Sequence, residues 1–306
     1  MDTQQLDWID SPSVEAVRGV IARAATADGT APVSEQAVHA VAGTGAARHL
    51  VCTARGSVVG YAQLEPGHGD HPAMAEVVVD PEARGSGIGT RLVAEVLRAG
   101  GPGTRVWAHG NLPAAAAVAR RLGLAGAREL LQLRRSLTTP ELPDIVVPDG
   151  VTLRTYRGPE DDAELLRVNA AAFEWHPEQG SWTQREIDER RAESWFDPQG
   201  LFLAFPSEDA AAGDPNRLLG FHWTKVHAPE NGNPALGEVY VVGIDPDAQG
   251  RGLGRVLTLA GLHHLRDRGL GTVLLYVEGD NTAALHTYER LGFERFHVDV
   301  AYAAGA

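Results

Sequence analysis

Cysteine is almost absent from this chain of 306 residues, since Cys52 is the single one. No disulfide can therefore form within it, which fits a reducing cytoplasm. Cys52 lies in the apolar run HLVCTA, which is typical of a buried structural thiol, with a nucleophile as the alternative. Long apolar runs are also missing, because no stretch reaches the roughly 18 residues that a membrane-spanning helix needs. The N-terminus MDTQQLDWID has no basic or apolar signal region, so we predict a cytoplasmic protein without a membrane partner.

Basic residues are scarce. The chain has 27 Lys and Arg against 40 Asp and Glu, a formal net charge of -13. Nucleic acids select basic patches, so we expect no nucleic-acid partner. The charge does not exclude a small phosphorylated cofactor, because a few backbone N–H groups with an Arg suffice to bind phosphate. With 43% hydrophobic and 22% charged residues the composition is that of a globular protein, and we expect a monomer.

One segment occurs twice. DPEARGSGIG at 80–89 returns as DPDAQGRGLG at 245–254, and RRLGL at 120–124 returns as ERLGF at 289–293. A repeat this long indicates two copies of one domain and not a solenoid. The segment TTPELPDIVVPDG, with three prolines, reads as a linker along the surface. We therefore predict a domain at 1–140, a linker at 141–150 and a domain at 151–306.

Each half shows the same order of elements. β-branched runs bounded by turns predict strands, and apolar residues at helical spacing predict helices. The strands are expected at 74–80, 104–109, 217–227, 237–245 and 271–278, and the helices at 11–24, 87–99, 113–123, 159–173, 252–268 and 281–292. This order predicts an α/β fold with a mixed sheet (α+β) in each half.

The repeated segment places a Gly-x-Gly loop between a strand and a helix. A helix N-terminus carries free N–H donors and a partial positive charge, and glycines let a phosphate approach the backbone. The cradle would comprise Gln249, Gly250, Arg251, Gly252, Leu253, Gly254 and Arg255, and in the first half Arg84, Gly85, Ser86, Gly87, Ile88 and Gly89. The third glycine of a dinucleotide fingerprint is absent, since Leu257 and Leu92 take its place, and no Gly-Lys-Ser/Thr follows. Tight turns without a ligand are the alternative.

The pattern R/Q-x-x-G-x-G after a strand ending in Asp-Pro resembles the acetyl-CoA loop of the GNAT acetyltransferase superfamily. The resemblance covers both halves and implies two tandem GNAT domains that use acetyl-CoA and no metal. It also implies a splayed strand whose backbone pairs with the pantetheine arm. The residues whose backbone would pair with this arm are Val242, Gly243 and Ile244, with Val77, Val78 and Val79 in the first half. Gly243 fits a bulge in that strand.

Acetyl transfer needs an acid for the leaving thiolate and a base for the amine. In the superfamily the acid is often a Tyr before the final Leu-Gly, which is Tyr288 here and Ala119 in the first half. Glu238 on the strand before the loop is the candidate base, and its counterpart by simple counting is Ala73. Glu76 aligns three residues further on, which would place it on the opposite face. We therefore predict a catalytic second half and a non-catalytic first half that retains its loop, which either holds acetyl-CoA without turnover or forms a wall for the substrate.

Longer segments resemble a tandem GNAT family of actinobacteria that acetylates the cysteinyl amine of Cys-GlcN-Ins. They are DGTAPVSEQAV, NAAAFEWHPEQGSWT, LLGFHWTKVH, GEVYVVGIDP and LLYVEGDNTAALHTYERLGF. The resemblance implies substrate contacts from Glu35, Glu178, Lys225, Glu238 and Tyr276. Carboxylates and a Lys suit a substrate rich in hydroxyls with one ammonium group.

Several alternatives stay open at this point. Asn281 at the start of the last helix is a cofactor contact or an N-cap. HGDH at 68–71 and the pair at 263–264 lack the spacing of zinc sites, so we expect no metal. The substrate could be another amine, or the protein could be an acetyl-CoA sensor without turnover.

Overall fold

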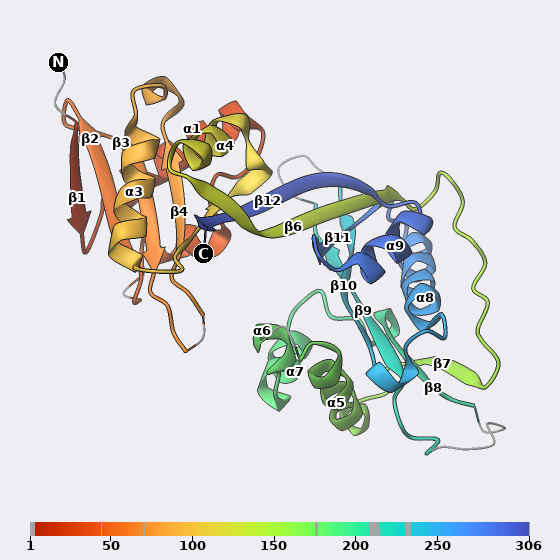
Figure 1. The fold of residues 1–306 in the computed structure, drawn as a ribbon. Coiled ribbons are helices and arrows are strands. Elements are labelled where there is room, and N and C mark those ends of the chain that lie inside the picture. The colour runs from red at the N-terminus through yellow and green to blue at the C-terminus, as the bar shows by residue number, and fades with distance from the viewer. Residues whose placement is uncertain are drawn as a thin grey trace. The chain divides into compact units, whose positions relative to one another are not determined.

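The computed structural model describes residues 4–43, 45–69, 71–174, 177–207, 214–229 and 234–305. They form two compact units (Figure 1). Unit 1 comprises Met1–Leu131, Glu278–Asp280 and His297–Ala306, and unit 2 comprises Gln132–Val277 and Asn281–Phe296. Each unit is a mixed sheet with helices on both faces, which confirms the predicted fold class. The division into halves at 140 and 151 stays a prediction.

The sheet of unit 1 has the order β1-β2-β3-β4-β5-β12. Its strands are β1 (Gln5–Ile9), β2 (Arg48–Ala54), β3 (Ser57–Glu65), β4 (Met74–Val79), β5 (Arg105–Ala108) and the end of β12 (Glu294–Ala304). Its helices are α1 (Val14–Asp28), α2 (Glu35–Ala40), α3 (Ile88–Gly100) and α4 (Pro113–Arg121). β4 and β5 are parallel, and the other neighbours with described pairings are antiparallel.

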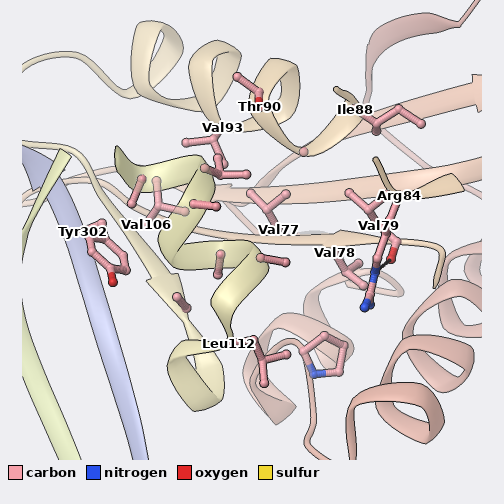
Figure 2. A pocket seen from close by; sticks show the side chains of 18 of the residues that line it. Val77, Val78, Val79, Arg84, Ile88, Thr90, Val93, Val106, Leu112 and Tyr302 are labelled. Carbon is pink, nitrogen blue, oxygen red and sulfur yellow. Dashed lines mark hydrogen bonds between the residues drawn. The ribbon is translucent and has the colours of Figure 1, made fainter. Parts of the chain in front are cut away.

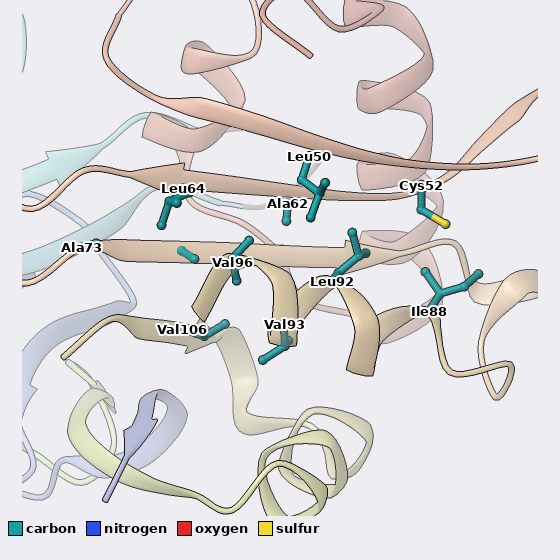
Figure 3. Packing of buried hydrophobic residues seen from close by; sticks show 11 residues of the cluster. Leu50, Cys52, Ala62, Leu64, Ala73, Ile88, Leu92, Val93, Val96 and Val106 are labelled. Atoms are coloured by element: carbon teal, nitrogen blue, oxygen red, sulfur yellow. The ribbon is translucent and has the colours of Figure 1, made fainter. Parts of the chain in front are cut away.

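Alternating side chains divide unit 1 into two apolar layers. Leu50 and Cys52 of β2 pack with Ile88 and Leu92 of α3 (Figure 3), whereas Val51, between them in sequence, packs in the cluster of α1. This is the period of two expected of a strand covered on both faces. Cys52 is fully buried, and burial raises the pKa of its thiol. The prediction of a buried structural cysteine is confirmed.

The sheet of unit 2 repeats this plan in the order β6-β11-β10-β9-β8-β7. Its strands are the end of β6 (Leu124–Ser136), β7 (Val151–Thr155), β8 (Leu201–Pro206), β9 (Gly220–His227), β10 (Leu236–Ile244) and β11 (Thr272–Glu278). Its helices are α5 (Asp162–Ala172), α6 (Pro177–Gly180), α7 (Gln184–Arg191), α8 (Leu253–Asp267) and α9 (Thr282–Arg290). β10 and β11 are parallel, as β4 and β5 are.

The repeated Asp-Pro has the same structural role in both units. Asp80 accepts hydrogen bonds from Arg23 of α1, and Asp245 accepts one from Arg167 of α5 at 2.7 Å. Each carboxylate also caps the short 3-10 turn that follows, at the N–H two residues on. A buried carboxylate needs such partners, so each pair fixes the end of a strand to the first helix of its unit.

The segment between the halves has neither helix nor strand over 138–150, as the prolines predict. Leu142 in it is buried, and Pro143 O lies 2.8 Å from Nε2 of His263 on α8. This segment therefore packs on unit 2 at these two residues. In the part of the chain that the structure describes, no helix is long and apolar enough to span a membrane.

Candidate active site

The Gly-rich loops have one geometry in both units. Gly250 and Gly252 have φ of 76° and 78°, and Gly85 and Gly87 have φ of 75° and 84°. These left-handed angles favour glycine. Gly252 and Gly87 are the N-cap residues of α8 and α3, so the free N–H groups of each helix start lie directly after the loop. The predicted loop geometry is thus present in both units, and its use for a phosphate stays a prediction.

The two parallel strands beside each glycine-rich loop separate toward the loop. β10 pairs with β11 at Gly237, Glu238 and Val239 only, although β10 continues to Ile244. In unit 1, β4 pairs with β5 at Met74, Ala75 and Glu76 and continues to Val79. The backbone of 240–244 is therefore unpaired on the β11 side, and that of 77–79 on the β5 side. An unpaired strand edge can accept an extended ligand chain, which is the splay that the family resemblance implies.

The bulge of β10 is not at Gly243, so that prediction is wrong. The register with β9 shifts between Val239 and Val241, while Gly243 lies in register opposite Phe221. Gly243 is required for packing, since a Cβ there would lie 2.5 Å from Cε1 of the buried Phe221. The extra residue of the bulge is Tyr240.

The bulge also changes the comparison of the two units. Compared through the antiparallel neighbours β9 and β3, Val239 matches Ala75, so Glu238 matches Met74 and not Ala73. Glu76 lies two residues from Met74, which keeps it on the same face. The prediction that Glu76 points to the opposite face is wrong, because simple counting misses the residue that the bulge adds to β10.

Glu238 is buried, with 7% of its surface exposed. Its Oε2 lies 2.7 Å from Nε2 of His227, and its Oε1 has no hydrogen-bond partner among the residues described. Lys225 of β9 is directly opposite, and Leu274 of β11 is the parallel neighbour. Tyr276, two residues beyond Leu274, lies on the same face. The structure therefore brings Glu238, Lys225 and Tyr276 together on one face of three adjacent strands.

Aromatic rings hold Lys225 away from Glu238. Its Nζ lies 5.1 Å from the centre of the Trp195 ring and 5.4 Å from that of Tyr240, distances at which a cation is attracted to the ring face. Tyr276 is 49% exposed, and its hydroxyl accepts a hydrogen bond of 2.7 Å from Gln132. Both side chains can thus meet a polar ligand.

Tyr288 lies on α9, which contacts α8 on the other face of the sheet. The Cβ position of Gly237 on β10 points to that face, since a Cβ there would meet Leu265 of α8. Burial raises the pKa of Tyr288 to about 12, so the hydroxyl is protonated at neutral pH. Its ring packs edge-on against Phe293, and its hydroxyl has no hydrogen-bond partner in the described part of the chain. Ala119 holds the same place on α4.

Asn281 is the N-cap of α9 and accepts a hydrogen bond of 3.1 Å from the N–H of Ala284. The N-cap alternative is therefore confirmed. Arg251 and Arg255 are exposed beside the cradle. Neither forms an ion pair with a described residue, which leaves both side chains available to an anion.

Unit 1 contains a cavity of about 470 Å³ at its own splay (Figure 2). Eight of the predicted cofactor residues line it: Val77, Val78, Val79, Arg84, Gly85, Gly87, Ile88 and Gly89. Ser86 is not part of the lining, and its hydroxyl donates a hydrogen bond of 2.6 Å to Ala83 O. Arg84 forms two hydrogen bonds with Asp28, which also lines the cavity. The site is apolar along the strand and charged at the loop.

Glu76 of unit 1 is held by other groups. Its carboxylate accepts hydrogen bonds from N and Oγ of Ser34, at 2.5 and 2.6 Å, and lies 3.1 Å from Nε2 of His109. His109 in turn lies 3.4 Å from Asp299, which His297 also contacts. Burial alone would lower the pKa of His109, but bonds to Asp299 and Glu76 outweigh it and raise the pKa to about 9. The negative charge of Glu76 is thus balanced by groups of unit 1.

Two predicted substrate residues are less defined. Glu35 is the exposed first residue of α2 in unit 1. Glu178 lies in the short helix α6, and its side chain is outside the described residues. Glu35 has no contact with a described residue that assigns it a role.

The sequence analysis did not identify four residues that lie around the carboxylates of Glu238 and Glu76: His227, Ser34, His109 and Asp299. A signal for His227 is present, because Trp223, Lys225 and His227 alternate along one strand and must share a face. The others come from distant segments, and only the fold brings them to Glu76.

A fold of this kind, with an anion cradle beside two parting strands, is that of an acyl-CoA-dependent transferase. The profile of the acetyltransferase (GNAT) family matches residues 20–124 and 168–293, so the chain belongs to this family. Over its whole length it is similar to the mycothiol acetyltransferases. It is 72% identical to that of Rhodococcus opacus strain B4 over 303 residues, which cover 98% of this chain and 97% of the relative. It is 56% identical to that of Mycolicibacterium smegmatis over 291 residues, 94% of each.

Solved structures support the fold. A GCN5-related N-acetyltransferase from Sphaerobacter thermophilus aligns with a TM-score of 0.71 at 21% identity, covering 98% of this chain and 94% of that one. A tandem GNAT protein from the clavulanic acid biosynthesis pathway aligns with a TM-score of 0.65 at 20% identity, covering 99% of each. The tandem arrangement is therefore shared.

Proposed function

We propose that this chain transfers the acetyl group of acetyl-CoA to the cysteinyl amine of Cys-GlcN-Ins, with mycothiol and CoA as products. The full-length similarity to mycothiol acetyltransferases supports the substrate. The observation that carries the chemistry is the pair Glu238 and Tyr288, on opposite faces of the splay in unit 2. A base on one face and an acid on the other suit a reaction in which an amine attacks and a thiolate leaves.

In this proposal Glu238 takes a proton from the amine, whose nitrogen forms a bond to the thioester carbon. Unpaired backbone N–H groups near Val242 polarise the carbonyl oxygen. The carbon–sulfur bond breaks, and Tyr288 gives its proton to the departing sulfur. Lys225 and Tyr276, on the face of Glu238, would hydrogen-bond hydroxyls of the acceptor, and Glu35 and Glu178 are further proposed contacts. The loop 249–255 would hold the pyrophosphate.

Unit 1 is proposed to bind acetyl-CoA without turnover. The cavity along Val77–Val79 and the second glycine cradle support binding. Ala119 in place of a Tyr, and Glu76 bonded to Ser34 and His109, both argue against chemistry there. Calorimetry should therefore give two acetyl-CoA molecules per chain. One molecule per chain would show that unit 1 has lost the site.

Tyr288→Phe tests the acid. It should lower kcat by about 10- to 100-fold and change KM for acetyl-CoA little, because the hydroxyl acts mainly in the transition state. Steady-state kinetics of the purified variant would show this. Unchanged turnover would remove Tyr288 from the mechanism.

The function itself is tested by mass spectrometry of products after incubation with acetyl-CoA and a panel of amines that includes Cys-GlcN-Ins. Thiol-reactive dyes are unsuitable, since the acceptor is itself a thiol. One acetyl group on the amine of Cys-GlcN-Ins alone would support the proposal. Transfer only to another amine would overturn the substrate, and no transfer to any amine would favour an acetyl-CoA sensor.

A further inference from the structure

Among the residues that the structure describes, the carboxylate of Glu238 has one partner, a histidine at the end of β9. Nε2 of His227 lies 2.7 Å from Oε2 of Glu238. In the register of the two strands His227 is opposite Leu236, so it lies diagonally from Glu238 on the same face. The side chain of Glu238 is 10% exposed and that of His227 is 39% exposed. The contact therefore joins a buried carboxylate to a ring that reaches solvent.

Two basic side chains compete for this carboxylate. Lys225 is directly opposite Glu238, yet its ammonium group lies over the rings of Trp195 and Tyr240 and forms no ion pair with Glu238. The bulge at Tyr240 places the second ring there, because it adds a residue to the face that Lys225 shares. The imidazole is therefore left as the group that fixes the carboxylate.

We propose that His227 is the positioning residue of the general base. This inference rests on the proposed function, in which Glu238 takes the proton of the acceptor amine. Nε2 of His227 carries a hydrogen and donates it to Oε2, because two unprotonated atoms at this distance would repel. Oε2 is then occupied, and Oε1, without a partner among the described residues, is directed to the amine.

A hydrogen bond to one oxygen restrains the rotation of a carboxylate about its terminal bond. Its free lone pairs then point in one direction, which is what proton transfer at hydrogen-bond distance requires. Without the imidazole the carboxylate would sample several orientations. Lys225 could also move toward it and occupy the oxygen that the amine needs.

The test compares the steady-state kinetics of His227→Ala and His227→Gln, with acetyl-CoA varied at saturating Cys-GlcN-Ins. The alanine variant should lose about 10- to 100-fold in kcat, with KM for acetyl-CoA within about two-fold of the parent. The glutamine variant retains an N–H donor and should recover most of that loss. Added imidazole should raise the rate of the alanine variant and not that of the glutamine variant. His263→Gln, on the outside of α8, is the matched control and should behave as the parent.

The outcomes separate this inference from the function on which it rests. If the parent acetylates Cys-GlcN-Ins and Glu238→Gln is inactive, while His227→Ala has the parent's kcat, the positioning role is overturned. Equal losses in the alanine and glutamine variants, without rescue by imidazole, would also overturn it, since they indicate a purely structural contact. A parent enzyme that is inactive on every amine overturns the proposed function instead.

Discussion

Replacing Glu238 by glutamine should lower kcat/KM for Cys-GlcN-Ins by about 10²- to 10⁴-fold, the range typical of a lost general base. Glutamine keeps the shape of the side chain and can still bond His227, but it cannot accept a proton from an ammonium group. The bond to His227 at 2.7 Å preserves the position of the side chain, so the loss should be one of chemistry and not of folding. Quantifying acetylated product by mass spectrometry at several substrate concentrations would give the ratio.

The matched control is Glu76→Gln in unit 1. Glu76 lies on the corresponding face of β4, but Ser34 and His109 bind its carboxylate. We expect kcat per folded molecule to stay within about two-fold of the parent, because unit 1 is proposed to be non-catalytic. A large loss at Glu76 with a small one at Glu238 would reverse the assignment of the two units.

The parts of the site that follow from local sequence could be predicted. Gly-x-Gly between a strand and a helix requires left-handed backbone, and both loops have it at Gly252 and Gly87. The prediction that Ala119 takes the position of Tyr288 in the first half is also correct. The helices α9 and α4 each follow a strand after a short loop and have the same length. Such features depend on a few adjacent residues, and periodicity suffices to place them.

Features that depend on strand pairing could not be predicted. The bulge at Tyr240 has no sequence signal of its own, since Tyr suits a regular strand as well. It nevertheless decides which residue of β4 corresponds to Glu238. Sequence analysis also assigned no element to β6 or β12. Each begins in one unit and ends in the other, and the end of β12 pairs with β5 at Val300 and Ala108.

Unit 1 should lose stability as the pH rises from about 7 to about 10. The pKa of His109 is about 9 in the fold, against 6.5 in an unfolded chain. A raised pKa means that the stabilisation is fully present below 6.5 and is lost as the pH rises through about 9. The difference corresponds to about 3 kcal/mol for a side chain that is 16% exposed. The partners Glu76 and Asp299 have lowered pKa values, despite burial, because His109 and backbone N–H groups bond them. Their share is lost only as the pH falls through their folded pKa values, far below this range.

Hydrogen exchange followed by mass spectrometry can measure this within one unit. Peptides from β4 and β5 should lose protection between pH 7 and 10 after correction for the intrinsic exchange rate. Peptides from β9 and α8 are the internal control. Burial there lowers the pKa of His222 to about 4, so this histidine stays neutral throughout the range.

His109→Gln separates the ion pair from other effects of alkali. Glutamine can still bond one carboxylate, but it carries no charge, so Glu76 and Asp299 would face each other without a cation between them. The variant should therefore be less stable than the parent at pH 7 and equal to it near pH 10. A parent protein whose β4 and β5 peptides keep constant protection would show that His109 is not charged in the fold. In that case the neutralisation of Glu76 would rest on Ser34 alone, and the account of why unit 1 lacks a free base would have to change.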